Sequence, residues 1–291
     1  MRLKDFRVKQ KTKVDLEEWP TRIKADHRSK KHYQELLAKQ IEAMSELQNR
    51  LYADNHQSLL IIFQAMDAAG KDSAIKHVMS GLNPQGCQVF SFKHPSAEEL
   101  DHDFLWRTTR CLPERGRIGI FNRSYYEEVL ILRVHPELLL AQGLVNADPE
   151  SEQFWEDRYQ SIVDLEQHLT RNGTRIIKFF LHLSKEEQCE RFLSRIEEPE
   201  KNWKFSLDDL KERACWKQYQ QAYETCLSTT SSREAPWYVV PADDKETARL
   251  IIADIVVDTL SDMNPHYPQL GAKQLNELQQ AKELLHKETS K

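Results

Sequence analysis

Residues 59–73 read Leu-Leu-Ile-Ile-Phe-Gln-Ala-Met-Asp-Ala-Ala-Gly-Lys-Asp-Ser. A continuous apolar run leads into a turn of small residues, then Gly70 and Lys71, and then a helical pattern. This order of strand, turn and helix is the context in which a phosphate-binding loop occurs. Backbone N–H groups at the start of such a helix point at phosphate oxygens, and the lysine neutralises their charge. The sequence therefore predicts a phosphate site formed by Ala68, Ala69, Gly70, Lys71 and Asp72.

The loop departs from the general Walker A pattern at two positions. Ala65 stands where the first glycine is usual, and Asp72 stands where a serine or threonine normally binds Mg²⁺. A carboxylate can bind Mg²⁺ instead, so Asp67 is the first candidate metal ligand and Asp72 a weaker one. The alternative is an ordinary strand-to-helix turn in which Asp67 caps the helix.

Four further apolar runs follow the same pattern: Val89–Phe92, Arg117–Phe121, Arg175–Leu183 and Trp237–Val240. With Leu59–Phe63 they predict five strands. Nearly continuous hydrophobicity is typical of strands buried on both faces, as in a parallel sheet covered by helices. Alternation with helical patterns predicts an α/β fold, a P-loop kinase-like three-layer α/β/α sandwich with a five-stranded parallel sheet.

Helical patterns occupy the segments between these runs. They cover residues 30–51, 71–80, 96–110, 124–133, 151–171, 185–196, 207–227 and 244–260. Ser124 with Glu127 and Ser184 with Glu187 have the capping-box spacing. Ser206 with Asp209 is a weaker version.

We expect one domain over residues 1–291. It comprises a basic N-terminal arm and helix (1–52), a sheet with flanking helices (58–190 and 228–262), a lid (191–227) and a C-terminal tail helix (263–291). The arm is expected to be ordered against the body. The tail is a polar amphipathic helix that either docks or is solvated.

The third apolar run ends in Asn122-Arg123-Ser124, where a Walker B strand is expected. Asn122 replaces the usual aspartate and can bind Mg²⁺-bound water through its carbonyl. Ligands of such sheets bind at the carboxyl ends of the strands, so Arg123 is expected to face phosphate. Lys93, at the end of the second strand, and Arg133, ten residues beyond Arg123, are further candidates.

Two of these assignments have structural alternatives. Glu127 is either a third, weaker metal ligand or the capping partner of Ser124. Arg123 is either a phosphate ligand or one half of a surface ion pair, and its place beside a phosphate loop favours the former.

Residues 191–206 predict a hinged, basic hairpin. Arg191 and Arg195 are four residues apart and share one helix face. Pro199 ends that helix, and Lys201 and Lys204 follow in a short loop. Such a lid closes over a charged substrate and excludes water.

The alternative for this segment is a solvated hairpin whose lysine and glutamate charges pair locally. We assign Trp203 to core packing rather than to stacking on a base.

The composition limits the partners. The net charge is −5, so any polyanion must meet a local basic surface. No apolar run reaches the ~18–20 residues that span a bilayer, and no secretory signal is visible. The five cysteines lack Cys-x-x-Cys spacing, which argues against disulfides and zinc and fits a reducing cytoplasm. We expect a cytoplasmic protein without a membrane or nucleic-acid partner.

Four segments together resemble the polyphosphate kinase 2 family over about residues 25–262. They are Gln-Ala-Met-Asp-Ala-Ala-Gly-Lys-Asp (64–72), His-Val-Met-Ser-Gly-Leu-Asn-Pro-Gln-Gly (77–86), Ser-Phe-Lys-His-Pro-Ser (91–96) and Phe-Asn-Arg-Ser-Tyr-Tyr-Glu-Glu (121–128). The Asn-Arg-Ser form is similar to the class III branch. Ala65 and Ser73 depart from the family, which usually has glycine there, so we expect a slightly altered loop.

The resemblance implies a kinase that transfers the terminal phosphoryl group of inorganic polyphosphate to AMP and ADP, reversibly. It implies Mg²⁺ as cofactor, with Mn²⁺ as an alternative, and adenine or guanine nucleotides as substrates. It also implies a sheet of the thymidylate-kinase type and a homodimer or homotetramer.

The candidate residues then take roles. We expect catalytic roles for four residues, Asp67, Lys71, Arg123 and Arg133. The expected metal ligands are Asp67, Asp72 and Glu127. Polyphosphate or nucleotide phosphates are bound by the groups that follow: Ala68, Ala69, Gly70, Lys71, Asp72, Lys93, Asn122, Arg123, Arg133, Arg191, Arg195, Lys201 and Lys204.

Two other functions remain open. An ATP-dependent nucleoside monophosphate kinase shares the fold, loop and lid. A non-catalytic nucleotide-binding protein would explain Ala65 and Asn122 as decay of the motif.

Overall fold

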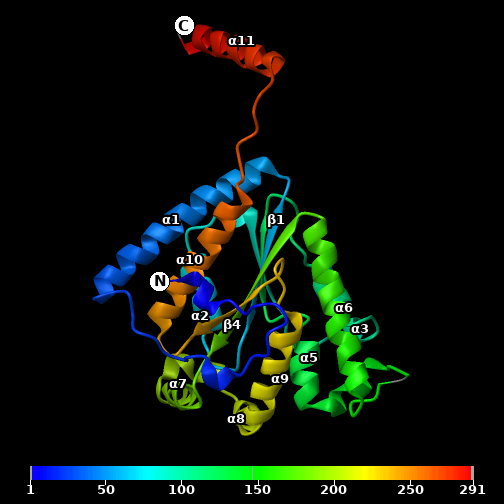
Figure 1. The fold of residues 1–291 in the computed structure, drawn as a ribbon. Helices are drawn as coiled ribbons and strands as arrows, with labels where there is room; N and C mark the ends of the chain where they lie inside the picture. Colours follow the sequence, from blue (N-terminus) through cyan, green and yellow to red (C-terminus); the bar gives the residue numbers. More distant parts are fainter. Residues whose placement is uncertain (1, 146, 290–291) are drawn as a thin grey trace.

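The structure is a computed structural model that describes residues 2–145 and 147–289. A parallel sheet lies between two helical layers (Figure 1). Its five strands are β1 (Ser58–Gln64), β2 (Cys87–Ser91), β3 (Ile118–Asn122), β4 (Thr174–His182) and β5 (Trp237–Pro241). They lie in the order β2-β3-β1-β4-β5, and every neighbouring pair is parallel. The predicted fold class is confirmed.

Two hydrophobic cores flank the sheet. α1 (Lys30–Asp54), α2 (Lys71–Val78) and α10 (Lys245–Met263) contribute to the core on one face. α5 (Glu127–Val134), α6 (Glu152–Arg171) and α9 (Trp216–Thr230) contribute to the core on the other. The central strand β1 is buried throughout, with alternate side chains in alternate cores.

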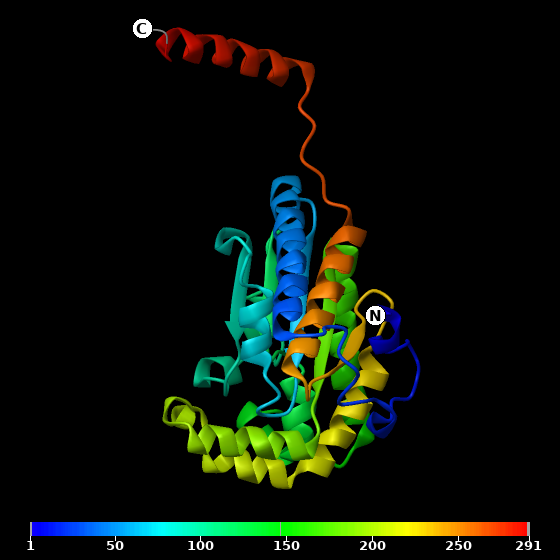
Figure 2. The ribbon, with the colours of Figure 1, turned by 90° about the vertical axis from the view of Figure 1, so that its left-hand side faces the viewer.

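The remaining helices are shorter or peripheral. α7 (Lys185–Glu197) and α8 (Leu207–Ala214) form the hairpin, and these two helices lie side by side at one end of the molecule (Figure 2). The others are α3 (Ala97–Leu100), α4 (Trp106–Thr109), α11 (Ala272–Thr289) and the 3₁₀ helices η1 (Leu3–Phe6), η2 (Leu16–Glu18), η3 (Pro84–Gly86), η4 (Pro136–Gln142) and η5 (Pro199–Lys204).

The edge strand β2 corrects one expectation. We expected all five strands to be buried on both faces, but no residue of β2 is fully buried and Val89 is 50% exposed. The order of the strands explains this, because β2 has a neighbour on one side only.

Two predicted helices are each divided. The segment 96–110 contains the separate helices α3 and α4, and the segment 207–227 is interrupted at Cys215. The hydrophobic pattern continues across both interruptions, so it does not show the breaks.

The helix caps agree in part with the sequence. Ser184 Oγ accepts a hydrogen bond from the N–H of Glu187, and Ser206 forms a full capping box with Asp209. The predicted Ser124 cap is wrong, because Ser124 Oγ accepts from the N–H of Tyr126 and α5 begins at Glu127.

The N-terminal arm is ordered against the body, as expected. The side chains of Val8, Val14 and Leu16 are buried in the core beneath α9. The backbone N–H of Val8 donates to the carbonyl of Trp237, and that of Val14 donates to Ser228 Oγ. The arm therefore packs along β5 and α9.

The C-terminal helix α11 is solvated in this structure. It extends away from the body in both views (Figures 1 and 2), and all of its residues are exposed. Across the described residues, no helix is both long and apolar enough to cross a bilayer.

Replacing Leu60 by alanine should lower the free energy of unfolding by about 2–5 kcal/mol, because the change leaves a cavity in the central strand. Leu60 is 0% exposed, whereas Leu278 in α11 is 56% exposed. Leu278→Ala is therefore the matched control and should change stability by less than about 0.5 kcal/mol. Urea denaturation measures both variants, and equal losses would contradict the assignment of the core.

Candidate active site

The loop between β1 and α2 turns through two left-handed residues. Ala68 has φ 62° and Gly70 has φ 103°, and Gly70 occupies the N-cap position of α2. The alternative in which Asp67 caps this helix is therefore wrong. The first N–H groups of a helix have no partners within it, so those of α2 are available to an anion.

Arg191 holds this loop from the hairpin side. Its guanidinium donates to the carbonyls of Ala68 (3.1 Å) and Ala69 (2.8 Å). It also donates to the carbonyls of Ala242 (2.6 Å) and Asp243 (3.2 Å). The side chain is buried, so it braces the loop as well as lining the cavity.

Lys71 is the first residue of α2. Its Nζ donates to the carbonyl of Ala65 at 3.0 Å and so lies across the loop. Burial lowers the pKa of Lys71 from its ordinary value of 10.5, and the positive charge of Arg123 lowers it further. The negative charge of a bound anion would raise this pKa and so oppose both effects.

Arg123 lies at the tip of β3, next to the loop that follows β1. Its Nη2 is 3.1 Å from Asp67 Oδ1, and its Nη1 is 3.6 Å from Glu127 Oε2. The charge of Glu127 raises the pKa of Arg123, whereas burial raises the pKa of Glu127. The ion pair considered as the alternative exists, but its partners are two candidate site residues.

Asn122 ties the β3 tip to α2, because its Nδ2 donates to Asp72 Oδ1 at 2.6 Å. Asp67 and Asp72 each use one carboxylate oxygen in these contacts. Within residues 2–145 and 147–289, no group of three or more His, Cys, Asp or Glu side chains could hold a metal by itself. Mg²⁺ commonly takes one or two carboxylates together with water and substrate phosphates, and two aspartates fit that requirement.

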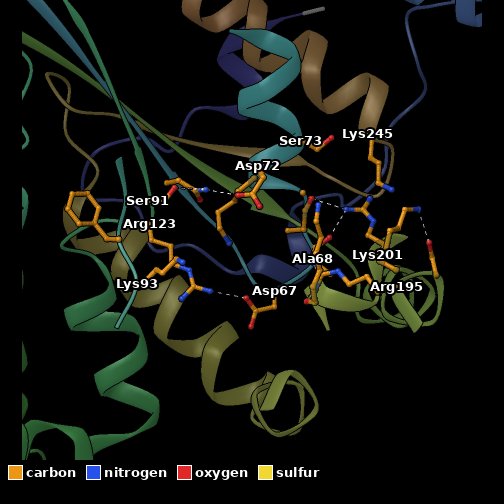
Figure 3. Close-up of a pocket in the computed structure, with 18 of the residues that line it drawn as sticks. Asp67, Ala68, Asp72, Ser73, Ser91, Lys93, Arg123, Arg195, Lys201 and Lys245 are labelled. Atoms are coloured by element: carbon orange, nitrogen blue, oxygen red, sulfur yellow. Dashed lines mark hydrogen bonds and ion pairs between the residues drawn. The ribbon is translucent and has the colours of Figure 1, made fainter. Parts of the chain in front are cut away.

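These elements surround a cavity of about 570 Å³. Figure 3 shows Lys93 and Arg123 on one side of it, and Arg195, Lys201 and Lys245 on the other. Eight lysine and arginine side chains line the cavity, against the two carboxylates of Asp67 and Asp72: Lys71, Lys93, Arg123, Arg191, Arg195, Lys201, Lys204 and Lys245. The site is therefore strongly cationic in a chain of net charge −5.

The cavity gathers nearly all the predicted phosphate ligands, including Ala68, Ala69, Gly70 and Asn122. Lys245 was missed by the sequence reasoning. It begins α10, directly beyond the carboxyl end of β5, and that position was the available signal.

The position of Arg133 corrects the predicted set of phosphate ligands. It does not line this cavity, since it lies in the last turn of α5. There it forms an ion pair with Glu152 at 2.8 Å and lies over the ring of Trp155. Its placement does not favour a role in catalysis.

The hairpin charges are partly paired. Arg195 is 3.6 Å from Asp209, and Lys201 is 2.5 Å from Glu198. The prediction that Trp203 packs in the core is wrong, because its side chain is 79% exposed at the hairpin tip. Its ring instead contacts the ammonium of Lys204.

Two smaller cavities adjoin Arg123. One of about 340 Å³ shares Asp67 and Arg123 with the first and is walled partly by Tyr219 and Tyr223. The other, of about 220 Å³, is mainly apolar. Arg123, Glu127, Ile131 and Leu138 line both. An uncharged ring system could therefore lie beside the cationic cavity.

Comparison with known proteins identifies the family of this chain. The family model for polyphosphate kinase 2 matches residues 27–268. An ADP-polyphosphate phosphotransferase of Rhodopseudomonas palustris is 60% identical over 287 residues, 99% of each chain. An AMP/ADP-polyphosphate phosphotransferase of Meiothermus ruber is 40% identical over 92% of this chain and 96% of that protein. The crystal structure of polyphosphate kinase 2 from Arthrobacter aurescens TC1 superimposes with a TM-score of 0.84 at 37% identity, over 94% of each chain. The chain belongs to the polyphosphate kinase 2 family.

Proposed function

We propose that this protein transfers the terminal phosphoryl group of inorganic polyphosphate to ADP and AMP, reversibly. The observation that carries the proposal is the cavity lined by eight cationic side chains beside the phosphate loop. A linear anhydride with a charge on every phosphate suits a site with cations at both ends. The names of the 60% and 40% identical relatives support the same donor.

The reaction needs alignment and charge neutralisation more than covalent chemistry from the protein. Lys71 and the first N–H groups of α2 hold the terminal phosphate. Arg123, oriented by Asp67 and Glu127, neutralises charge on the oxygens of the transferred group. An acceptor oxygen forms a bond to the terminal phosphorus as the anhydride bond breaks, and the shortened polyphosphate leaves with those electrons.

Asp67 and Asp72 would hold Mg²⁺, or Mn²⁺ in its place. When bound, the ion neutralises phosphate charge and helps to align the reacting groups. Glu127 points at Arg123 and lines the neighbouring cavities, so it is the weaker candidate ligand.

The hairpin acts as a lid in this proposal. Arg195, Lys201 and Lys204 approach the cavity from the hairpin and contribute charge to one end of it. Closure over the substrate excludes water, which would otherwise compete with the nucleotide for the phosphoryl group.

The decisive experiment supplies purified protein with Mg²⁺, long-chain polyphosphate and ADP, AMP or GDP separately, without ATP. ATP formed from ADP and ADP formed from AMP are the expected products. Lys71→Ala should reduce the rate by roughly 10²–10³-fold, as loss of one preorganised charge stabiliser does.

The same assay separates the alternatives. Turnover of AMP with ATP but not with polyphosphate would establish a nucleoside monophosphate kinase. Nucleotide binding with no turnover would establish a binding protein. Activity on ADP alone would limit the acceptor to diphosphates, as in the name of the 60% identical relative.

The lowered pKa of Lys71 predicts where activity is lost at alkaline pH, which is the alkaline limb of the pH–activity profile. The ammonium form is required to bind phosphate, so kcat/KM for polyphosphate should fall as pH rises through a midpoint below 10.5. Lys71→Arg should move this limb to higher pH, because a guanidinium stays protonated.

Lys76→Arg, an exposed position on the same helix, should leave the limb in place. An unchanged limb in Lys71→Arg would assign it to another group, first of all Lys245, whose pKa desolvation also lowers.

A bulky residue at position 131 should block the nucleoside without affecting polyphosphate. Ile131 lines both smaller cavities but not the cationic one. Ile131→Trp should therefore raise KM for ADP by roughly tenfold or more, as loss of about 1.4 kcal/mol of binding does. Steady-state kinetics with each substrate varied would measure this, and an equal rise in KM for polyphosphate would contradict it.

A further inference from the structure

Arg123 has a backbone conformation that needs external support. Its φ is 65°, in the left-handed region that non-glycine residues rarely adopt. Such a conformation costs free energy and persists only where the surrounding structure enforces it. On one side, the N–H of Arg123 donates to the carbonyl of Phe63 in β1.

The backbone that follows Arg123 is held by two tyrosines, Tyr125 and Tyr126, which are two and three residues further along the chain. The hydroxyls of Tyr125 and Tyr126 both donate to Glu166 Oε1, at 2.9 Å and 2.8 Å. Both rings are buried, at 1% and 0% exposure. The backbone after Arg123 is therefore anchored twice to one carboxylate on α6.

That carboxylate is itself fixed by a lysine on β4. Lys178 Nζ lies 2.5 Å from Glu166 Oε2 and also donates to the Tyr126 hydroxyl (2.8 Å) and the carbonyl of Thr230 (2.9 Å). Lys178 is 0% exposed and the Glu166 side chain 3% exposed. All three ammonium protons and both carboxylate oxygens have partners.

Stability alone is a weak explanation for this network. Bringing two charges into a core costs desolvation that their attraction often fails to offset, and an apolar pair of similar size is frequently as stable. The ion pair instead fixes the orientation of its neighbours, since its hydrogen bonds hold the two tyrosine hydroxyls in place relative to the sheet. None of the cavities around Arg123 is lined by Glu166 or Lys178.

We propose that Glu166 and Lys178 are positioning residues for the reaction. Through Tyr125 and Tyr126 they hold the backbone of Arg123 in its left-handed conformation, and so hold its guanidinium beside Asp67. This inference rests on the proposed role of Arg123 in phosphoryl transfer.

The test removes one hydroxyl. Tyr126→Phe leaves Lys178 bound to Glu166 and Thr230, so the protein should still fold. We expect kcat to fall roughly tenfold, within the 10²-fold that a 1 Å misplacement can cost, with KM for both substrates nearly unchanged. Tyr159→Phe is the matched control, because Tyr159 is 3% exposed on α6 and its hydroxyl has no partner among the described residues. It should keep the wild-type kcat.

A double-mutant cycle separates positioning from a merely structural role. Arg123→Ala alone should reduce kcat by about 10²–10³-fold, as loss of one charge stabiliser does. In that background Tyr126→Phe should cause no further loss of kcat, although it should lower the melting temperature as much as in the wild type.

Each result is informative. Additive losses of kcat, or a wild-type kcat in Tyr126→Phe, would overturn the positioning role and leave the proposed function intact. Normal turnover by Arg123→Ala would instead refute the proposed role of Arg123, and the inference with it.

Discussion

The parallel pairing of β1 with β3 is the constraint on which the site depends. In this register Phe63 lies opposite Asn122, so the loop after β1 and the tip after β3 begin at the same edge of the sheet. Asp67 and Arg123 are 56 residues apart in the chain but form a 3.1 Å ion pair. The hydrogen bond from Asn122 Nδ2 to Asp72 Oδ1 depends on the same register. A shift of one residue would reverse the faces of β3 and separate these groups.

Electrostatic repulsion is the second constraint. Eight cations share one cavity, and the protein offsets their repulsion locally, with Asp67 and Glu127 at Arg123 and backbone carbonyls at Arg191. The offset is incomplete, since the cavity is lined by eight lysine and arginine side chains and by only two carboxylates, those of Asp67 and Asp72. A polyanion that enters relieves the remaining repulsion. In the proposed function, the binding of polyphosphate and the selectivity for highly charged ligands would both follow from this relief of repulsion.

Patterns that depend on near neighbours in the chain could be interpreted from the sequence. Four strands, β1, β3, β4 and β5, are short apolar runs because they are largely buried on both faces, and the predicted phosphate loop is one contiguous segment. The errors have a different origin. The exposure of β2 depends on strand order, and the exposure of Trp203 depends on where the hairpin tip lies. Arg133 follows the β3 tip closely in sequence, but a helix carries it away from the cavity.

The sequence by itself determined the α/β class, the five strands, the predicted phosphate loop around Lys71 and the family resemblance. Each of these features depends only on residues that are adjacent or regularly spaced in the chain. Only the tertiary structure decided which cations share the cavity, brought in Lys245, and joined Glu166, Lys178 and the two tyrosines into one buried network. Those contacts join α6 and β4, which are neighbours in the chain, to Tyr125 and Tyr126 about 40 residues earlier, and bring α10 to the loop after β1. Their distances follow from how the helices pack on the sheet, which no local pattern records.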